Sequence, residues 1–228
     1  MSADLPEPAG RLRAALRDES SSARLQSALA AGTYPDPRFV AVLVDRSGIE
    51  PDFFVRDMLT WALTRHSPSD TVPRLLYEVG ADLPQARSQA LHTLSKIGDP
   101  RGWTAISPEV LRDPNDDVAT TAWRTAAGLV PPGQEVALAE ELGSQLGRGA
   151  RETQRSLSRA IVALGDVAIP MLHAHALASQ RNADVRIHAL ATERLIHDPE
   201  EGFESAIAEA TRQERPDPTL RIEPDPAP

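Results

Sequence analysis

One stretch decides how this chain folds: residues 111–123 read Leu111-Arg-Asp-Pro-Asn-Asp-Asp-Val-Ala-Thr-Thr-Ala-Trp123. The Asp-Pro-Asn segment is typical of a break between two helices. The carboxylates that follow can cap the free amides of a new helix, and the helix dipole favours negative charge there. The apolar residues after them are spaced as on one helical face. The stretch therefore predicts a turn and a helix that begins near Asp116 or Asp117.

The same pattern recurs along the chain with a nearly constant period. Superposing five segments gives steps of 31, 32, 35 and 32 residues between the reference positions Arg56, Arg87, Ala119, Gln154 and Arg186. Apolar residues follow each reference position at helical spacing, as at Leu59 and Leu63 or at Leu157 and Ile161. The Asp52 and Asp184 side chains precede two of these positions and can cap their helices. The period predicts an array of helical repeats.

Each repeat is expected to contain a first and a second helix. The second helices are expected over residues 51–66, 84–97, 116–129, 150–165 and 183–196. The first helices are expected near 36–47, 70–79, 102–112, 134–147 and 167–178, with an unpaired helix near 200–212. We expect three parts: a helical cap over 1–34 that matches the repeat poorly, the repeats over 35–212, and a disordered, proline-rich acidic tail over 213–228.

These motifs resemble HEAT repeats. The run 111–123 resembles their turn and second-helix start, and so does Asn182-Ala-Asp-Val-Arg-Ile-His-Ala189. Pro73, Pro108 and Pro170 stand where that family bends its first helix. The resemblance covers roughly residues 35–212, with Ala119 and Gln154 where arginine would stand. It implies an all-α fold, a right-handed α–α superhelix or HEAT/ARM-like solenoid of about five helix pairs plus terminal caps.

Composition narrows the function classes. The 228 residues contain no cysteine and carry a net charge of −9. Disulfides and thiolate zinc sites are therefore excluded, and a whole-surface nucleic-acid binder is disfavoured. No apolar run approaches the roughly 18 residues of a membrane span, and the N-terminus has no secretory pattern. We expect a cytoplasmic monomer without membrane contact.

No catalytic or cofactor-binding motif is present. His173 and His175 lie two residues apart, so on one helix their side chains diverge and cannot share a metal directly. We therefore predict no catalytic residue, no cofactor and no metal site. Glu193 occupies a core position in the repeat register. We expect it to be buried or half-buried and paired with a cation such as Arg159 or Arg186; the alternative is an acid/base or ligand-anchoring group.

The HEAT resemblance implies that the second helices line a concave face. Candidate partner-binding residues on that face are Trp61, His92, Arg124, Arg155 and Arg159. The reference arginines Arg56, Arg87 and Arg186 are expected to bond the turns of neighbouring repeats as a structural ladder. The second helices carry a net charge of +3 and the first-type helices −6, so the face is expected to be mildly basic.

The expected function is a non-catalytic scaffold that binds an acidic or extended segment of another protein. One alternative is a DNA-binding protein that resembles HEAT-like alkylated-base glycosylases. Asp57, Arg56 and Trp61 come nearest to their site, but no residue is carried over as catalytic. Another alternative is a HEAT-like lyase related to bilin-attachment proteins, or another small-molecule enzyme. The net charge weighs against nucleic acid, because phosphate contacts need many cations.

Overall fold

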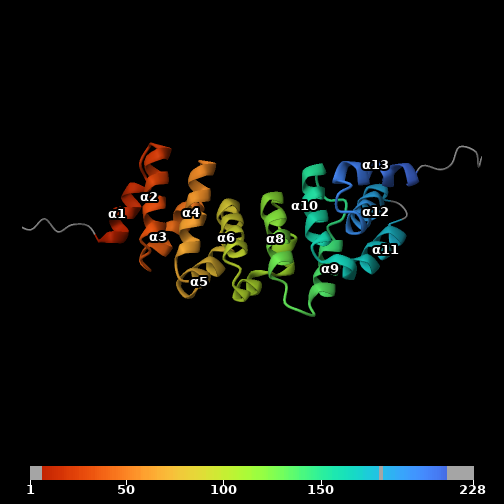
Figure 1. Cartoon of the computed structure of the whole chain (residues 1–228), viewed down its shortest axis with the longest axis horizontal. Helices are drawn as coiled ribbons and strands as arrows, with labels where there is room; N and C mark the ends of the chain where they lie inside the picture. Colours follow the sequence, from red (N-terminus) through yellow and green to blue (C-terminus); the bar gives the residue numbers. More distant parts are fainter. Residues whose placement is uncertain (1–6, 180–181, 215–228) are drawn as a thin grey trace, which may run out of the picture. The chain divides into compact units, whose positions relative to one another are not determined.

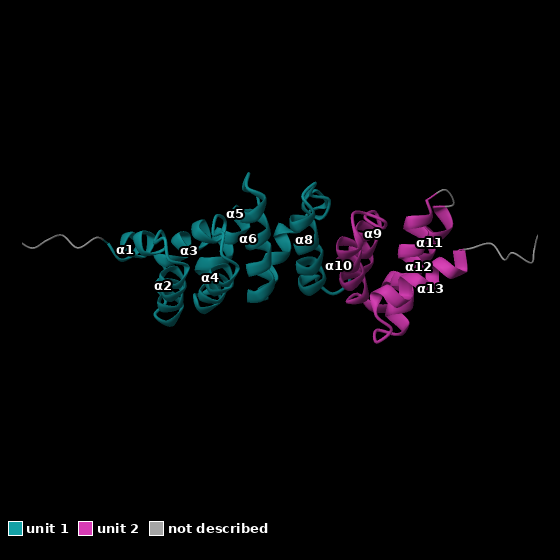
Figure 2. Ribbon diagram, turned by 90° about the horizontal axis from the view of Figure 1, so that it is seen from above, with its two compact units in different colours: residues 1–134 teal, residues 135–228 magenta. Residues whose placement is uncertain are grey.

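The structure, a computed structural model of the chain, describes residues 7–179 and 182–214. Over these residues it contains α-helices and two 3₁₀ helices, and no strand (Figure 1). The chain divides into two compact units, Met1–Gln134 and Glu135–Pro228, called unit 1 and unit 2 (Figure 2). The prediction of an all-α protein is confirmed, and its helices pack in adjacent pairs.

Unit 1 contains two rows of helices. One row is α1 (Pro8–Ala15), α3 (Phe39–Ser47), α5 (Pro68–Glu78) and the 3₁₀ helix η1 (Pro100–Ala105). The other is α2 (Ser21–Thr33), α4 (Phe53–Arg65), α6 (Pro84–Ile97) and α8 (Asp116–Leu129). Successive members of each row are in contact. The rows also pack on each other, α3 on α4 and α5 on α6, and the short helix α7 (Pro108–Leu111) packs on α8.

Unit 2 contains α9 (Glu135–Gly143), α10 (Arg151–Val162), the 3₁₀ helix η2 (Gly165–Ala168), α11 (Ile169–Ala178), α12 (Ala183–His197) and α13 (Phe203–Glu214). Helix α10 packs on α9 and α12, and α13 packs on α12. Gln213 and Glu214, which the prediction assigned to the tail, are helical, and Arg186 binds the Glu214 carboxylate. The remaining residues of that tail, 215–228, lie outside the described residues.

Side-chain caps begin three of the second helices, α4, α8 and α12. The Asp52 carboxylate accepts from the amides of Phe54 and Val55 at the start of α4, as the sequence predicts. At α8 and α12 the cap is an asparagine one or two residues earlier than the predicted aspartates, at Asn115 and Asn182. The predicted aspartates lie in the first turn instead, where the helix dipole still favours their charge.

Prolines divide two of the expected first helices. The helix expected over 102–112 is η1 followed by α7, with Pro108 in the first turn of α7 and Ser107 in extended conformation. Proline disfavours a helical conformation for the residue before it and has no amide to donate, so the helix restarts there. Pro170 likewise lies in the first turn of α11, after η2. Only Pro73 of these three lies inside a helix, α5.

Leucine and alanine side chains of the second helices form much of the core, together with residues of the first helices such as Leu43 and Leu75. Leu59, Leu63 and Leu157 are buried, as the spacing predicts. The Trp123 ring is also buried, and its Nε1 donates to the carbonyl of Leu111 at 2.8 Å. That bond joins α8 to α7 and satisfies the one polar atom of the indole. It therefore connects the first and last residues of the stretch 111–123.

Candidate functional site

Arginines link neighbouring turns within each unit. Arg87 donates to two carbonyls of the preceding turn, both at 3.0 Å, and to the Asp113 carboxylate at 2.9 Å. Arg56 donates to two carbonyls at 2.8 and 2.9 Å. Arg186 donates to a carbonyl at 2.7 Å and to the Glu214 carboxylate at 2.9 Å. The structure thus places all three reference arginines at turns, with a carboxylate partner for two of them.

A fourth arginine, Arg24, also binds the turn before its helix, and the sequence prediction missed it. Arg24 in α2 lies 32 residues before Arg56 and donates to two carbonyls of its preceding turn. Its Nε and Nη2 bind both oxygens of the fully buried Glu50, and Arg46 binds the same carboxylate at 2.7 Å. Helices α1 and α2 therefore form a further pair of the repeating type. Ala86-Arg87 reads like Ala23-Arg24, so the signal was present in the sequence.

Two adjoining hollows of about 430 and 340 Å³ lie across α4, α6 and α8 of unit 1, and we call them the α4–α8 groove. Both are lined by Arg56, Ser88, Gln89, Thr121 and Arg124. The smaller hollow is also lined by Phe53, Asp57, Thr60, His92 and Lys96. Almost every lining side chain is polar. Two residues predicted for partner binding, His92 and Arg124, therefore meet here, with Lys96 as an addition that the sequence reasoning missed.

Cationic side chains outnumber carboxylates among the residues that line the smaller hollow. Arg56, Lys96 and Arg124 contribute cations, and Asp57 contributes the one carboxylate among its lining residues. Burial first, and then the charges of Arg124 and Lys96, lower the pKa of His92, while Asp57 opposes them. None of the three cations forms an ion pair with a carboxylate in residues 7–179 and 182–214. Their charge is therefore not neutralised by direct contacts inside the described chain.

Two residues that line this hollow each have a buried polar atom without a hydrogen-bond partner within the described residues: Thr60 Oγ1 and His92 Nδ1. Thr60 is only 3% exposed. A buried polar atom without a partner costs about 1–3 kcal/mol. Most buried hydroxyls of these helices avoid that cost; Thr93, for example, donates to the Gln89 carbonyl at 2.8 Å.

Aromatic residues flank the groove on α4. Phe53 lines the smaller hollow, is 65% exposed and meets Phe54 edge to face at 5.6 Å. Trp61, which the sequence reasoning grouped with His92 and Arg124, is not among the groove's lining residues. It is 38% exposed and packs on α2 at Gly32, where a Cβ atom would lie 2.4 Å from the indole ring. The absence of a side chain at Gly32 is therefore what allows Trp61 its place.

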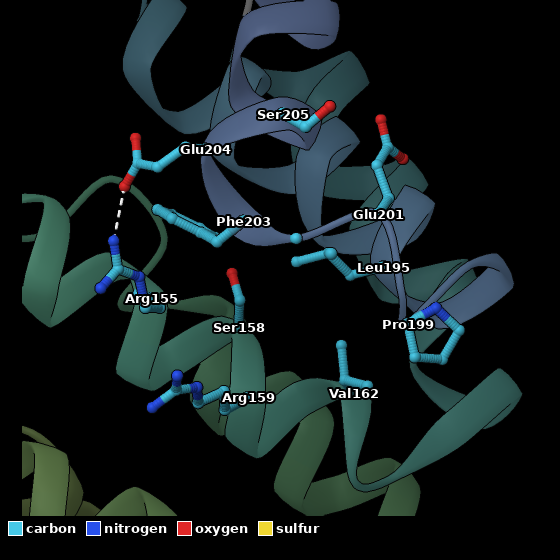
Figure 3. Close-up of a pocket in the computed structure, with 11 residues that line it drawn as sticks. Arg155, Ser158, Arg159, Val162, Leu195, Pro199, Glu201, Phe203, Glu204 and Ser205 are labelled. Atoms are coloured by element: carbon cyan, nitrogen blue, oxygen red, sulfur yellow. Dashed lines mark hydrogen bonds and ion pairs between the residues drawn. The ribbon is translucent and has the colours of Figure 1, made fainter.

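A second cavity, of about 520 Å³, lies in unit 2 between α10 and the start of α13, and we call it the α10–α13 pocket (Figure 3). Its apolar lining residues are Val162, Leu195, Pro199 and Phe203. Arg155 and Arg159, both predicted for partner binding, line it from α10. These arginines lie in unit 2, whereas Trp61, His92 and Arg124 lie in unit 1.

The two arginines of the pocket have different surroundings. Arg155 binds Glu204 at 2.7 Å and Glu152 at 3.1 Å, and its guanidinium lies 5.8 Å from the centre of the Phe203 ring. Figure 3 shows the Arg155–Glu204 contact as a dashed line among the residues that line the pocket. Arg155, a residue predicted for partner binding, thus has two carboxylate partners within unit 2. Arg159 is exposed and has no ion pair or hydrogen bond from its side chain in the described part of the chain.

A serine and a histidine meet beside this pocket, but their hydrogen bonds do not suit nucleophilic catalysis. The amide of Gly147 donates to His188 Nδ1 at 3.0 Å, so the ring proton of neutral His188 is on Nε2. That proton faces the Gln154 carbonyl and Ser158 Oγ, at 3.1 and 3.0 Å. His188 therefore has no free lone pair with which to take a proton from Ser158, as a serine nucleophile requires. The pair instead joins α10 to α12.

Glu193 pairs with histidines rather than with the predicted arginines. Its Oε1 lies 2.8 Å from His173 Nε2 on α11 and 3.8 Å from His197 Nε2 on its own helix. The carboxylate side chain is 21% exposed, which agrees with the half-buried position expected from its register. Among the described residues, no three His, Asp or Glu side chains gather closely enough to hold a metal ion.

The fold and the groove define an all-helical protein of adjacent helix pairs with a polar, basic hollow. No family model matches the chain, and no curated protein matches it. Among solved structures, it is similar to an engineered protein whose crystal structure was determined by the Northeast Structural Genomics Consortium, with 16% identity and a TM-score of 0.45. The match covers 90% of this chain and 98% of that one. A likeness at this level supports no conclusion about function.

Across the described part of the chain, no single helix has the length and apolar character needed to cross a membrane. One pair, α10 with the η2–α11 segment, passes that test by length and composition only, and it is bent by 116°.

Proposed function

We propose that this protein is a HEAT-type helical-repeat scaffold that binds an acidic, extended segment of another protein in the α4–α8 groove and catalyses no reaction. We also propose that the helix pairs form a right-handed superhelical solenoid. It is supported by the two rows of helices in unit 1 and by the turn-binding arginines Arg24, Arg56 and Arg87, which recur at steps of 32 and 31 residues.

One observation carries the proposed function: Arg56, Lys96 and Arg124 converge on one hollow without a carboxylate partner within the described residues. Three adjacent cations repel one another, so the empty groove is less favourable than one that holds an anion. Arginine forks bind carboxylates in bidentate geometry, and the exposed Phe53 ring offers an apolar anchor beside them. An acidic segment with an occasional apolar side chain fits this combination.

Protein is favoured over nucleic acid as the partner. The groove has few cations for a duplex backbone, and Asp57 and Asp117 also line it. Affinity for duplex DNA rises with the number of phosphates that cations neutralise, and the chain as a whole carries −9. Asp57 and Arg56, the nearest matches to a glycosylase-like site, do line the groove, but Trp61 is held against Gly32.

The test is binding of a fluorescently labelled oligoglutamate peptide to the full chain, followed by fluorescence anisotropy. The double variant Lys96→Glu, Arg124→Glu reverses two groove charges on exposed positions. We expect it to lower affinity at least about 100-fold, since each lost charge-assisted contact contributes about 1.5–3 kcal/mol. Arg65→Glu is the matched control, because Arg65 is an exposed cation at the end of α4 that does not line the groove.

The control protein should bind the peptide nearly as well as the wild type, and the affinity of both should fall as salt rises. Equal binding by the wild type and the groove variant, with helical circular dichroism unchanged, would remove the groove from consideration. Tighter binding of a mixed-sequence DNA duplex than of the peptide would replace the proposed partner by nucleic acid.

A further inference from the structure

We infer that the α10–α13 pocket of unit 2 binds a small apolar molecule that carries a single carboxylate. The pocket shares no lining residue with the α4–α8 groove, so this site is independent of the proposed function. Three of its properties determine the ligand: the order of the side chains along α10, the charge that remains unpaired, and the apolar wall.

One face of α10 forms a wall of the pocket. The residues that α10 contributes are spaced by three, four and seven positions, and such positions share one side of a helix: Arg155, Ser158, Arg159 and Val162. Arg159 and Val162 are three residues apart and therefore neighbours on that face. A molecule lying along α10 meets a cation and an apolar side chain next to each other.

Among the described residues, the charged groups that line the pocket leave one cation without a partner. Glu204 binds Arg155 at 2.7 Å. Glu201 binds Arg194 at 2.9 Å. Arg159 is exposed, and its guanidinium has no ion pair or hydrogen bond in this part of the chain. Its planar fork matches the two oxygens of a carboxylate.

The same charges disfavour a ligand with a second negative charge. Glu201 and Glu204 also line the pocket, and their carboxylates would repel a dianion. The cation beside Arg159 on α10 is Arg155, which already has two carboxylate partners. One free cation between two carboxylates therefore favours a monoanion over a phosphate or a dicarboxylate.

The opposite wall favours an apolar body for this anion. Figure 3 shows Val162, Leu195 and Pro199 together on one side of the pocket and the guanidinium groups of Arg155 and Arg159 on the other. An apolar group that fills the first side removes both its own surface and that of the wall from water. The volume of about 520 Å³ lies within the range of about 300–1,000 Å³ that is usual for small-molecule sites.

The buried hydroxyl on this wall does not add a free polar atom. Ser158 Oγ lies 3.0 Å from His188 Nε2 and 2.7 Å from Thr192 Oγ1, so its hydrogen bonds join the helices. Phe203, at the start of α13, adds a ring that is 8% exposed. The pocket thus combines one available cation with an apolar wall, whereas almost every side chain that lines the α4–α8 groove is polar.

The test is titration of the full chain with octanoate, followed by calorimetry and by the methyl resonances of valine and leucine. Octanoate should bind in one saturable step and shift the resonances of Val162 and Leu195, but not those of Val118, which is buried in unit 1. Octanol, which has the same chain without the charge, should bind at least about tenfold more weakly. Butanoate should also bind more weakly, by about fourfold for each methylene that the pocket buries.

Arg159→Gln removes the unpaired charge at an exposed position, so the fold should be unaffected. We expect it to lower the affinity for octanoate at least about tenfold and to leave the affinity for octanol unchanged. Arg151→Gln is the matched control, because Arg151 is an exposed arginine on the same helix that does not line the pocket. The control protein should bind octanoate as the wild type does.

Absence of saturable octanoate binding would overturn the inference, and so would equal affinities for octanoate and octanol. Equal octanoate affinity in the two arginine variants would also overturn it, as would tighter binding of octyl phosphate than of octanoate. Tighter binding of the peptide Ala-Ala-Leu, lost on amidation of its terminal carboxylate, would assign the pocket to a peptide C-terminus instead. The Lys96→Glu, Arg124→Glu variant should bind octanoate like the wild type, so failure of this site leaves the proposed function standing and the reverse also holds.

Discussion

The α4–α8 groove of unit 1 and the α10–α13 pocket of unit 2 are built from helices of the same type. Their arginines differ in whether a neighbouring helix supplies a carboxylate partner. In the pocket, α13 brings Glu204 to Arg155, and the pair closes over the Phe203 ring. In the groove, no helix supplies a carboxylate to Arg124 among the described residues. The position of an arginine in the repeat therefore does not decide whether it is available to a partner. The residue that the next helix places opposite it does.

The same contrast holds for the turn-binding arginines, and it gives the largest expected effect. Arg24 forms an ion pair with the buried Glu50, which also binds Arg46. The hydrogen bonds of the Arg56 side chain go to backbone carbonyls only. Burial alone would raise the pKa of Glu50, but the bonds from Arg24, the Asp52 amide and Arg46 outweigh it and lower that pKa. We expect Glu50→Gln to lower the free energy of unfolding of unit 1 by about 3–5 kcal/mol, because it leaves buried cations unpaired.

The control for that variant is Asp82→Asn. Asp82 lies 26 residues after Arg56, as Glu50 lies 26 after Arg24, but it is exposed and its carboxylate has no ion pair in the described chain. Its loss should change stability by less than about 0.5 kcal/mol. All three tryptophans lie in unit 1, so urea unfolding followed by tryptophan fluorescence reports that unit. Equal effects of the two substitutions would contradict the expected difference between a turn-binding arginine with a carboxylate partner and one without.

In unit 2 the next effect is a dependence of stability on pH. Burial lowers the pKa of His188 to about 4, from an ordinary value of 6.5. The unfolded chain therefore takes up a proton near pH 6.5 and the folded unit only near pH 4. The contribution of neutral His188 is complete above pH 6.5 and is lost as pH falls towards 4, to a limit of about 3 kcal/mol.

Hydrogen exchange of the α12 amides across that pH window measures this effect in unit 2 alone. His188→Gln keeps a polar side chain at the site but does not titrate, so its stability should depend less on pH. An unchanged pH dependence in that variant would mean that His188 does not remain neutral in the folded unit.

The smallest expected effect comes from giving the groove arginine a carboxylate partner and removing the carboxylate partners of the pocket arginine. Thr120→Glu places a carboxylate four residues before Arg124 on α8, a spacing at which opposite charges pair along a helix. It should lower the affinity for the glutamate peptide about tenfold. In the pocket, Glu152→Gln with Glu204→Gln frees Arg155 at a stability cost of at most about 1 kcal/mol, since both carboxylates are exposed.

The combined triple variant should regain part of the lost peptide affinity, and Arg155→Gln should remove it again. Anisotropy titrations with the glutamate peptide measure these affinities for the Thr120→Glu variant, the double glutamine variant, the triple variant, and the triple variant with Arg155→Gln. If the freed Arg155 binds no peptide, the availability of a cation is insufficient, and the polar floor of the groove is needed as well.

Much of the helical pattern could be predicted from the sequence, because helix spacing and turn residues are local signals. The buried positions of Leu59, Leu63 and Trp123 and the half-buried position of Glu193 follow from register alone. The missed pair α1–α2 was also within reach, since counting 32 residues back from Arg56 finds Arg24.

The partners of side chains could not be predicted in the same way. Glu204 lies 49 residues from Arg155, and His173 lies 20 residues from Glu193. Such pairs depend on how neighbouring helices are placed, which a repeat period does not specify. Trp61 and Arg124 shared a register in the sequence, but the close approach of α2 at Gly32 holds Trp61 outside the groove.

Lys96 lines the α4–α8 groove, and it is the only lysine in the chain. Every other positively charged side chain there is a guanidinium, which does not react with amine-selective acylating reagents. Such a reagent would modify one side chain of the protein besides the terminal amine. The groove therefore carries its own chemical handle: a cross-linker attached at that nitrogen would capture whatever molecule occupies the site and record its identity covalently.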